Sequence, residues 1–156
     1  MALQRELKKK RPFESPQQEA ILNLLRTNDQ YQVRFSRLFR PYGITPSQYN
    51  VLRILRGEGQ PLPILEIAAR TITVVPGITG LIDRLEEAGF VKRQRCREDR
   101  RVIWVELTEK ARKTLAALDD PLEELHKQLI GRLTQAELKE LIRLLEKARE
   151  GLVDEE

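Results

Sequence analysis

Cysteine and histidine are almost absent from this chain of 156 residues, which contains only Cys96 and His126. A disulfide framework needs pairs of cysteines, and the common zinc sites need three or four ligands at set spacings. We therefore expect no metal site and no cofactor. His126 has no cysteine nucleophile, glycine-rich phosphate loop or nucleophile elbow to partner it. These absences argue against an enzyme.

Long apolar runs are also missing. The stretch from Ile72 to Val75 is interrupted by Thr73 and is far shorter than the roughly 18 residues that span a bilayer. The first eleven residues are too charged for a signal peptide. We therefore expect a cytoplasmic protein with no membrane partner, and the length suits one compact domain.

Charge is abundant but unevenly placed. Charged residues make up 33% of the chain and apolar residues 40%, a composition typical of a soluble, helix-rich domain. The net charge is only +4, yet residues 1–11 and residues 92–101 each carry a local +4, whereas residues 134–156 carry −3. A polyanionic partner is therefore suggested by where the charge lies rather than by its sum.

Capping signals predict where the helices begin. Residues 1–14 show no apolar period and are expected to form a flexible basic arm. Ser15, Thr45 and Thr134 each open a sequence typical of a capped helix start. Apolar residues at helical spacing predict two short helices in between: Leu65, Ala68, Ala69 and Ile72 for one, and Ile78, Leu81, Ile82 and Leu85 for the next. A leucine stripe predicts a long helix capped by Thr108 and bent at Pro121.

Between Phe90 and Leu107 the apolar period changes from 3.6 to 2, which predicts a β-hairpin with a charged tip. Two short helices followed by a hairpin make a winged helix-turn-helix. In that motif the second helix enters the DNA major groove and the wing reaches an adjacent groove. The predicted fold is thus mainly α with a small β-hairpin wing, with Pro76 in the first turn of the second helix.

The charge of the wing favours DNA as the partner. Residues 92–101 include six basic and two acidic residues. Taken alone, such a run of charge is usually a solvated surface. Residues 74–77 likewise fit two interpretations equally well: a turn before an ordinary core helix, or the start of a helix that reads DNA. Arginines at a hairpin tip directly after a helix-turn-helix fit DNA better, because a narrow minor groove attracts inserted arginine.

Three stretches resemble the MarR family of transcriptional regulators: residues 43–52 (GITPSQYNVL), residues 80–93 (GLIDRLEEAGFVKR), and residues 99–101 (DRR) leading to residues 105–108 (VELT). The resemblance covers roughly residues 35–115. It implies a winged helix-turn-helix at residues 44–107 and a homodimer formed by helices at residues 15–43 and 108–156. It also implies a pseudo-palindromic duplex operator and, for this chain, a repressor released by a small effector.

The resemblance also implies roles for single residues. Asp99 would pair with Arg101 and orient it toward the minor groove, and Thr79 and Arg84 match positions of the recognition helix. Gly80 stands where several relatives carry a basic or polar side chain, and Val102 where glycine or serine is frequent. The residues expected to bind DNA are Thr73, Val75, Pro76, Gly77, Thr79, Gly80, Arg84, Arg95, Arg97, Asp99, Arg100 and Arg101.

Family members often bind small aromatic or phenolic effectors between the dimer helices and the winged domain. The residues that could line such a pocket here are Tyr31, Phe35, Phe39, Tyr49 and Arg53. Aromatic residues at helical spacing are more often core, so both interpretations stay open. Cys96 lies between Arg95 and Arg97, which favours the thiolate; a redox-sensitive wing and an incidental exposed cysteine are the two alternatives.

A winged helix can also bind protein instead of DNA. The alternative function is therefore a protein-interaction module without operator binding. Salt dependence separates the two, because binding to phosphates weakens steeply as salt rises.

Overall fold

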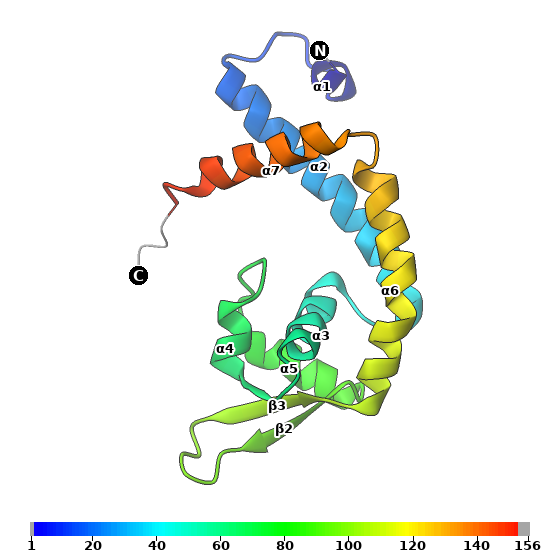
Figure 1. The fold of residues 1–156 in the computed structure, drawn as a ribbon. Helices are drawn as coiled ribbons and strands as arrows, with labels where there is room; N and C mark the ends of the chain where they lie inside the picture. Colours follow the sequence, from blue (N-terminus) through cyan, green and yellow to red (C-terminus); the bar gives the residue numbers. More distant parts are fainter. Residues whose placement is uncertain (1, 153–156) are drawn as a thin grey trace. The chain divides into compact units, whose positions relative to one another are not determined.

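The computed structural model describes residues 2–152 (Figure 1). It separates into two compact units, one ending at Leu118 and the other beginning at Asp119, where the sequence predicted one domain. The second unit holds the end of α6 (Glu109–Ile130) and α7 (Gln135–Arg149). No residue of α7 is buried, so its apolar stripe builds no core of its own.

The basic arm is partly folded, which corrects the prediction of a flexible segment over residues 1–14. Residues Ala2–Glu6 form α1, and Leu3 within it is only 4% exposed. Glu6 pairs with Arg26 of the next helix at 3.7 Å. The sequence did not predict this helix because the arm has no apolar period. One buried leucine and one ion pair stabilise it instead, and such tertiary contacts leave no local pattern.

Three of the predicted helix starts are confirmed. Ser15 caps α2 (Pro16–Phe39) by accepting a hydrogen bond from the Gln18 backbone. The Gln18 side chain does not complete a capping box with Ser15, because it accepts from the Glu14 N–H at 2.9 Å. Thr45 and Thr134 form complete capping boxes for α3 (Pro46–Glu58) and α7. A short 3₁₀ turn, η1 (Arg40–Tyr42), joins α2 to α3.

The next short helix, α4 (Ile64–Ala69), is shorter than predicted and buries a different face. Ile64 and Ile67 point inward, whereas Leu65 is 80% exposed and Ile72 is 78% exposed. Residues 71–75 are all β-branched, which lowers helix propensity, and Pro76 disfavours helix in the residue before it. The chain therefore leaves the helix after Ala69 and runs through a connection of residues 70–77 before α5 (Ile78–Glu87).

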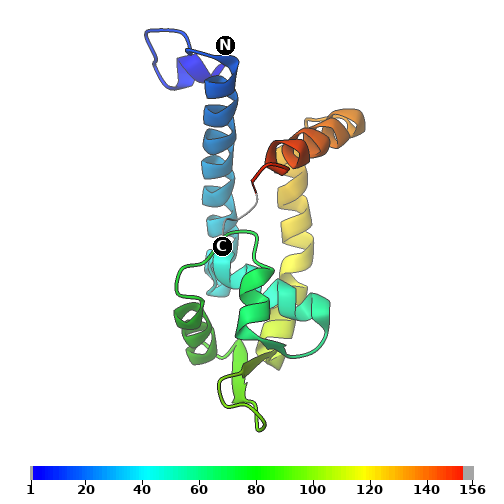
Figure 2. The same cartoon turned by 90° about the vertical axis from the view of Figure 1, so that its left-hand side faces the viewer.

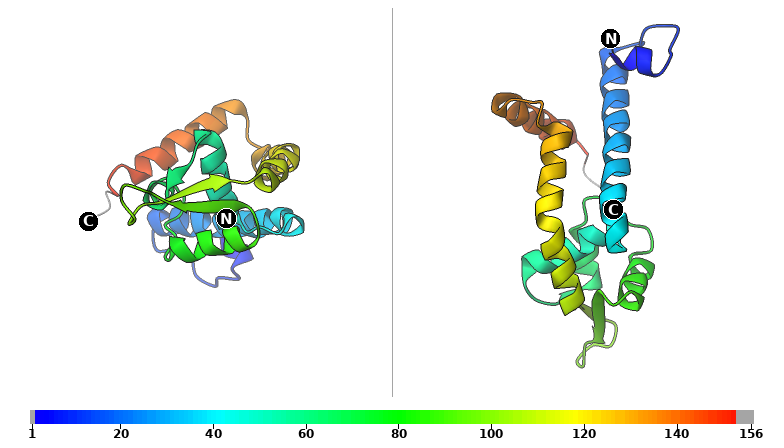
Figure 3. Two further views of the ribbon diagram at one scale, coloured as in Figure 1. Left: turned by 90° about the horizontal axis from the view of Figure 1, so that it is seen from below. Right: turned by 90° about the vertical axis from the view of Figure 1, so that its right-hand side faces the viewer.

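The hairpin is confirmed as β2 (Val91–Arg95) and β3 (Ile103–Leu107), antiparallel with Arg93 opposite Val105. A third strand, β1 (Leu62–Pro63), pairs with β3, so the sheet order is β1-β3-β2. Figure 1 shows α3, α4 and α5 grouped beside this sheet, and the turn between β2 and β3 projects away from them (Figure 2; Figure 3, right).

The core of the first unit joins the winged region to the start of α6. Its fully buried side chains come from several elements: Val51, Leu52, Ile67, Ile82, Leu85, Val91, Val105, Leu115 and Leu118. Thr108 caps α6 as expected, since its hydroxyl accepts from the Ala111 N–H at 3.3 Å and donates to the Gly89 carbonyl at 2.6 Å. The helix continues past Pro121.

Candidate nucleic-acid interface

The helix expected to enter the major groove, α5, begins later than predicted. Its N-cap is Gly77 in the left-handed region, with φ of 73°, a conformation that favours glycine. The Gly77 carbonyl accepts from the backbone N–H groups of Gly80 and Leu81 at 3.0 and 3.3 Å. Pro76 therefore precedes the helix instead of standing in its first turn, because the left-handed Gly77 separates them.

The predicted DNA-facing residues of this segment are mostly open to solvent. Val75 is half-buried, and the others are exposed: Thr73, Pro76, Gly77, Thr79, Gly80 and Arg84. A Cβ atom added at Gly77 or Gly80 would meet no atom within 4 Å. The N-terminal end of α5 therefore presents backbone and small side chains to a surface that another molecule can approach closely.

The base of the wing is attached to α5 by one arginine. Arg93 of β2 donates from its backbone N–H to Glu86 at 2.7 Å and from Nε and Nη2 to the same carboxylate at 3.1 and 3.0 Å. Its Nη1 also pairs with Asp83. These bonds, first the backbone one and then the guanidinium, lower the pKa of Glu86 below its usual 4.5. They fix α5 against β2, the strand that leads into the tip of the wing.

The tip of the wing is ordered by its own backbone. Cys96 N–H donates to the Val102 carbonyl at 2.9 Å, and Val102 N–H donates to the Asp99 carbonyl at 3.0 Å. The Asp99 carboxylate accepts from the Arg101 backbone N–H at 3.0 Å. Asp99 thus holds Arg101 through the main chain in an Asx-type turn, where the resemblance implied a pairing of side chains.

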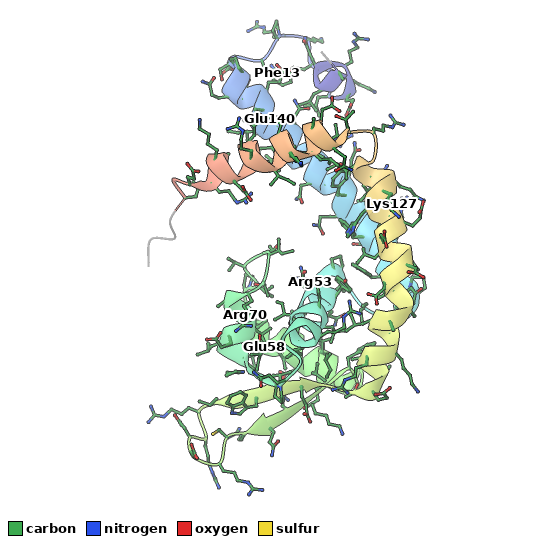
Figure 4. All side chains as sticks on the ribbon, viewed as in Figure 1. Phe13, Arg53, Glu58, Arg70, Lys127 and Glu140 are labelled. Atoms are coloured by element: carbon green, nitrogen blue, oxygen red, sulfur yellow. The ribbon has the colours of Figure 1, made fainter. Side chains whose placement is uncertain are left out.

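The arginines at the tip of the wing differ from Arg70 and Arg93 of the same unit in having no carboxylate partner within residues 2–152. Arg95, Arg97, Arg100 and Arg101 are exposed, and none of them forms an ion pair within residues 2–152. Arg70, by contrast, lies against Glu58 at 2.7 Å and Glu66 at 3.3 Å (Figure 4). Four guanidinium groups with no internal partner can bind phosphates or enter a groove.

The thiol of Cys96 is half-buried at the end of β2. Its pKa is lowered from the ordinary 9.0, chiefly because the backbone N–H of Asp99, and then that of Glu98, donates to the sulfur. The direction agrees with the sequence expectation, but the cause is the turn of the tip rather than the neighbouring arginines.

The residues predicted to line an effector pocket are brought together in part. The Phe39 ring stacks on Tyr49 with centroids 4.6 Å apart and on Phe35 at 6.3 Å. Phe39 is only 2% exposed, so it belongs to the core, whereas Phe35, Tyr49 and Tyr31 are half-buried. Arg53, labelled in Figure 4, is half-buried on α3.

Two hollows of the first unit lie elsewhere, beside Gln60 and Pro61. One, of about 310 Å³, is also lined by Arg56 and Arg112; the other, of about 380 Å³, is also lined by Trp104. Neither is lined by the predicted effector residues.

Within the described chain, no helix combines the length and apolarity needed to span a membrane. The same residues contain no group of three or more potential metal ligands.

Sequence reasoning missed two features of this surface. The first is the pairing of Arg93 with Asp83 and Glu86, although the two acidic residues stand three apart on one helix face, a spacing that can hold a shared cation. The second is the exposure of Ile72 and Val74. The helix pattern assigned Ile72 to a buried face and gave Val74 no place. The run of β-branched residues was the available signal for the second.

Comparisons with known proteins agree with this architecture. A family model described as the MarR family matches residues 44–103. A MarR transcription factor from Planctomyces limnophilus is 41% identical, with 86% of this chain and 98% of that chain covered and a TM-score of 0.68. The homoprotocatechuate degradative operon repressor of Escherichia coli is 25% identical over 123 residues, 79% of this chain and 82% of that protein.

The fold is also similar to that of a mutant MarR from Escherichia coli solved in complex with operator DNA. That structure shares 24% identity, covers 80% of this chain and 89% of its own, and gives a TM-score of 0.68. The Planctomyces relative is similar over nearly all of both chains. This chain therefore belongs to the MarR family of transcriptional regulators.

Proposed function

We propose that this regulator binds a pseudo-palindromic duplex operator as a homodimer, with α5 in the major groove and the wing in the adjacent minor groove. The observation that supports the proposal most strongly is the set of four exposed tip arginines that form no ion pair within residues 2–152 and that lie on a wing joined to α5 by Arg93. A cation that is not neutralised inside the protein is available to DNA phosphates.

The proposed contacts divide by chemistry. Arg101 enters the minor groove, with Asp99 fixing its backbone, while Arg95, Arg97 and Arg100 contact phosphates or the groove edge. Thr79 and Arg84 face the major groove from α5, and Gly80 allows close approach of the backbone. Thr73, Val75, Pro76 and Gly77 lie beside the groove at the helix start.

The homodimer is proposed from apolar side chains that the terminal helices leave open. Ile142 and Leu144 of α7 are 55% and 48% exposed, and Ile21, Leu24 and Leu25 of α2 are 58%, 47% and 59% exposed. Apolar stripes of this extent are typical of a subunit interface. Analytical ultracentrifugation checks the proposal: a dimer is expected at micromolar concentration, and a folded monomer would contradict it.

Repression and release by an effector form the regulatory part of the proposal. Repression is the action named for the related operon repressor. The proposed effector is a small aromatic or phenolic molecule near Phe35 and Tyr49, whose rings already form a stack with Phe39. Adding aromatic acids and phenols to the operator complex checks this part, and release is the expected result.

Selection of bound duplexes from random DNA tests the central proposal. We expect an enriched sequence with two inverted half-sites, and the logarithm of the affinity for it should fall linearly with the logarithm of salt concentration. A randomised duplex of the same length serves as the matched control and should bind more weakly at every salt concentration. Failure to enrich any duplex would favour a protein-interaction module instead.

A further inference from the structure

Two apolar side chains are unusually open in the connection between α4 and α5. Ile72 is 78% exposed and Val74 is 83% exposed, whereas Val75 and Ile78 are half-buried. Single exposed apolar residues are ordinary on protein surfaces. These two flank Thr73 in the connection of residues 70–77 that leads to α5, so they belong to the segment that the proposed function places beside the major groove.

Hydrogen-bonding side chains are scarce in the same segment. From residue 72 to residue 80, the hydroxyl groups of Thr73 and Thr79 are the only polar side-chain groups. Proteins commonly read guanine with arginine or lysine and adenine with asparagine or glutamine. None of these four residue types occurs in the segment. A base edge that approaches the open surface at Gly77 and Gly80 would therefore meet mostly apolar groups.

The major groove presents one apolar group, the 5-methyl of thymine. We propose that Val74 and Ile72 contact thymine methyl groups in each half-site and thereby select thymine at fixed positions. The inference rests on the proposed function and adds the base that the start of α5 selects. The wing favours a similar composition, because the narrow minor groove of A·T tracts attracts arginine.

Replacing thymidine with deoxyuridine tests the inference, because the exchange removes only the methyl group. Full-length protein is titrated against the selected operator with one exchange at a time. We expect about fourfold weaker binding at one or two positions in each half-site, the effect of losing contact with one methyl group, and no change elsewhere.

Two variants assign the effect to side chains. Val74→Ala and Ile72→Ala should each weaken binding to the thymidine operator, and at the positions read by the altered side chain deoxyuridine should cause no further loss. Leu65→Ala is the matched control, because Leu65 is equally open at 80% exposure but stands on α4. It should keep the full sensitivity to deoxyuridine. Thermal unfolding should be unchanged in all three variants, since the side chains are exposed.

The outcomes separate the two proposals. Tight operator binding without any sensitive position overturns the inference and leaves the proposed function standing. Sensitivity that persists in both Val74→Ala and Ile72→Ala, or that disappears in Leu65→Ala, also overturns it. Failure to bind any duplex overturns both proposals together.

Discussion

The base and the tip of the wing use arginine in opposite ways. At the base, Arg93 is paired with Asp83 and Glu86 and joins β2 to α5. At the tip, the guanidinium groups of Arg97 and Arg101 have no ion-pair partner within residues 2–152. The difference shows that the net charge of residues 92–101 does not say how many of their cations are free to bind DNA. Neutralised arginine positions the elements, and only unpaired arginine remains for DNA.

The strongest test of this comparison removes the tip arginine expected in the minor groove. Arg101→Ala should weaken operator binding by about 1–3 kcal/mol, as is typical for an arginine that reads a groove. Fluorescence anisotropy with the selected operator measures the loss. The melting temperature should not change, because Arg101 is exposed and its side chain forms no ion pair within residues 2–152.

Arg112→Ala is the matched control for that measurement. Arg112 is also an exposed arginine of the first unit, 56% exposed at its side chain, but it stands on α6 with Glu109 only 4.0 Å away. We expect its removal to leave operator affinity nearly unchanged. Equal losses in the two variants would contradict a special role for the tip.

The second test moves to the base of the wing, where the effect should appear in stability. Arg93→Ala removes the guanidinium shared by two carboxylates, and we expect it to lower the free energy of unfolding by about 1 kcal/mol. Urea unfolding followed by circular dichroism measures this. The estimate is at the upper end for exposed pairs, because Glu86 accepts from two guanidinium nitrogens.

Arg143→Ala provides the comparison for stability. It breaks an exposed pair with Glu140, 2.7 Å apart within α7, which joins no separate elements. Its unfolding midpoint should stay close to that of the parent protein. If Arg93→Ala behaved the same way, the base arginine would not be structural.

Local signals were sufficient to predict much of this fold before the structure. Caps at Ser15, Thr45, Thr108 and Thr134 depend on residues within a few positions, and they lie where the sequence indicated. The hairpin could likewise be predicted from its period of two. The tip loop of the candidate site could be placed as well, because it lies between the two predicted strands.

What could not be predicted depends on tertiary contacts or on competing local preferences. The pairing of Arg93 with Glu86 joins residues of two different elements, and Leu3 is buried although its segment has no apolar period. Ile72 fits a helical stripe, but the run of β-branched residues ends the helix before it. The exposed apolar pair beside α5 was missed for that reason.

The third test uses pH to show that Glu86 stabilises the fold as a carboxylate. Its pKa is lowered in the folded protein, so the stabilisation is present above 4.5 and is lost as pH falls through the lowered folded-state pKa. Glu86→Gln should be less stable than the parent at pH 7 by less than about 1 kcal/mol. The difference should shrink when unfolding is measured below pH 4.5. A difference independent of pH would assign the effect to packing.

The smallest effect on operator affinity is expected at Asp99, whose role is to position the tip rather than to supply positive charge. Its carboxylate accepts the Arg101 backbone N–H at 3.0 Å, and asparagine can keep this bond whereas alanine cannot. Both substitutions remove the same negative charge near DNA, so comparing the two variants with each other isolates the hydrogen bond. Asp99→Ala should bind the operator about twofold more weakly than Asp99→Asn, the value of one exposed hydrogen bond. Equal affinities would show that the hydrogen bond from the Arg101 N–H to residue 99 does not orient Arg101 for binding. The tip arginines would then attract DNA by their charge alone, whatever the geometry of the turn.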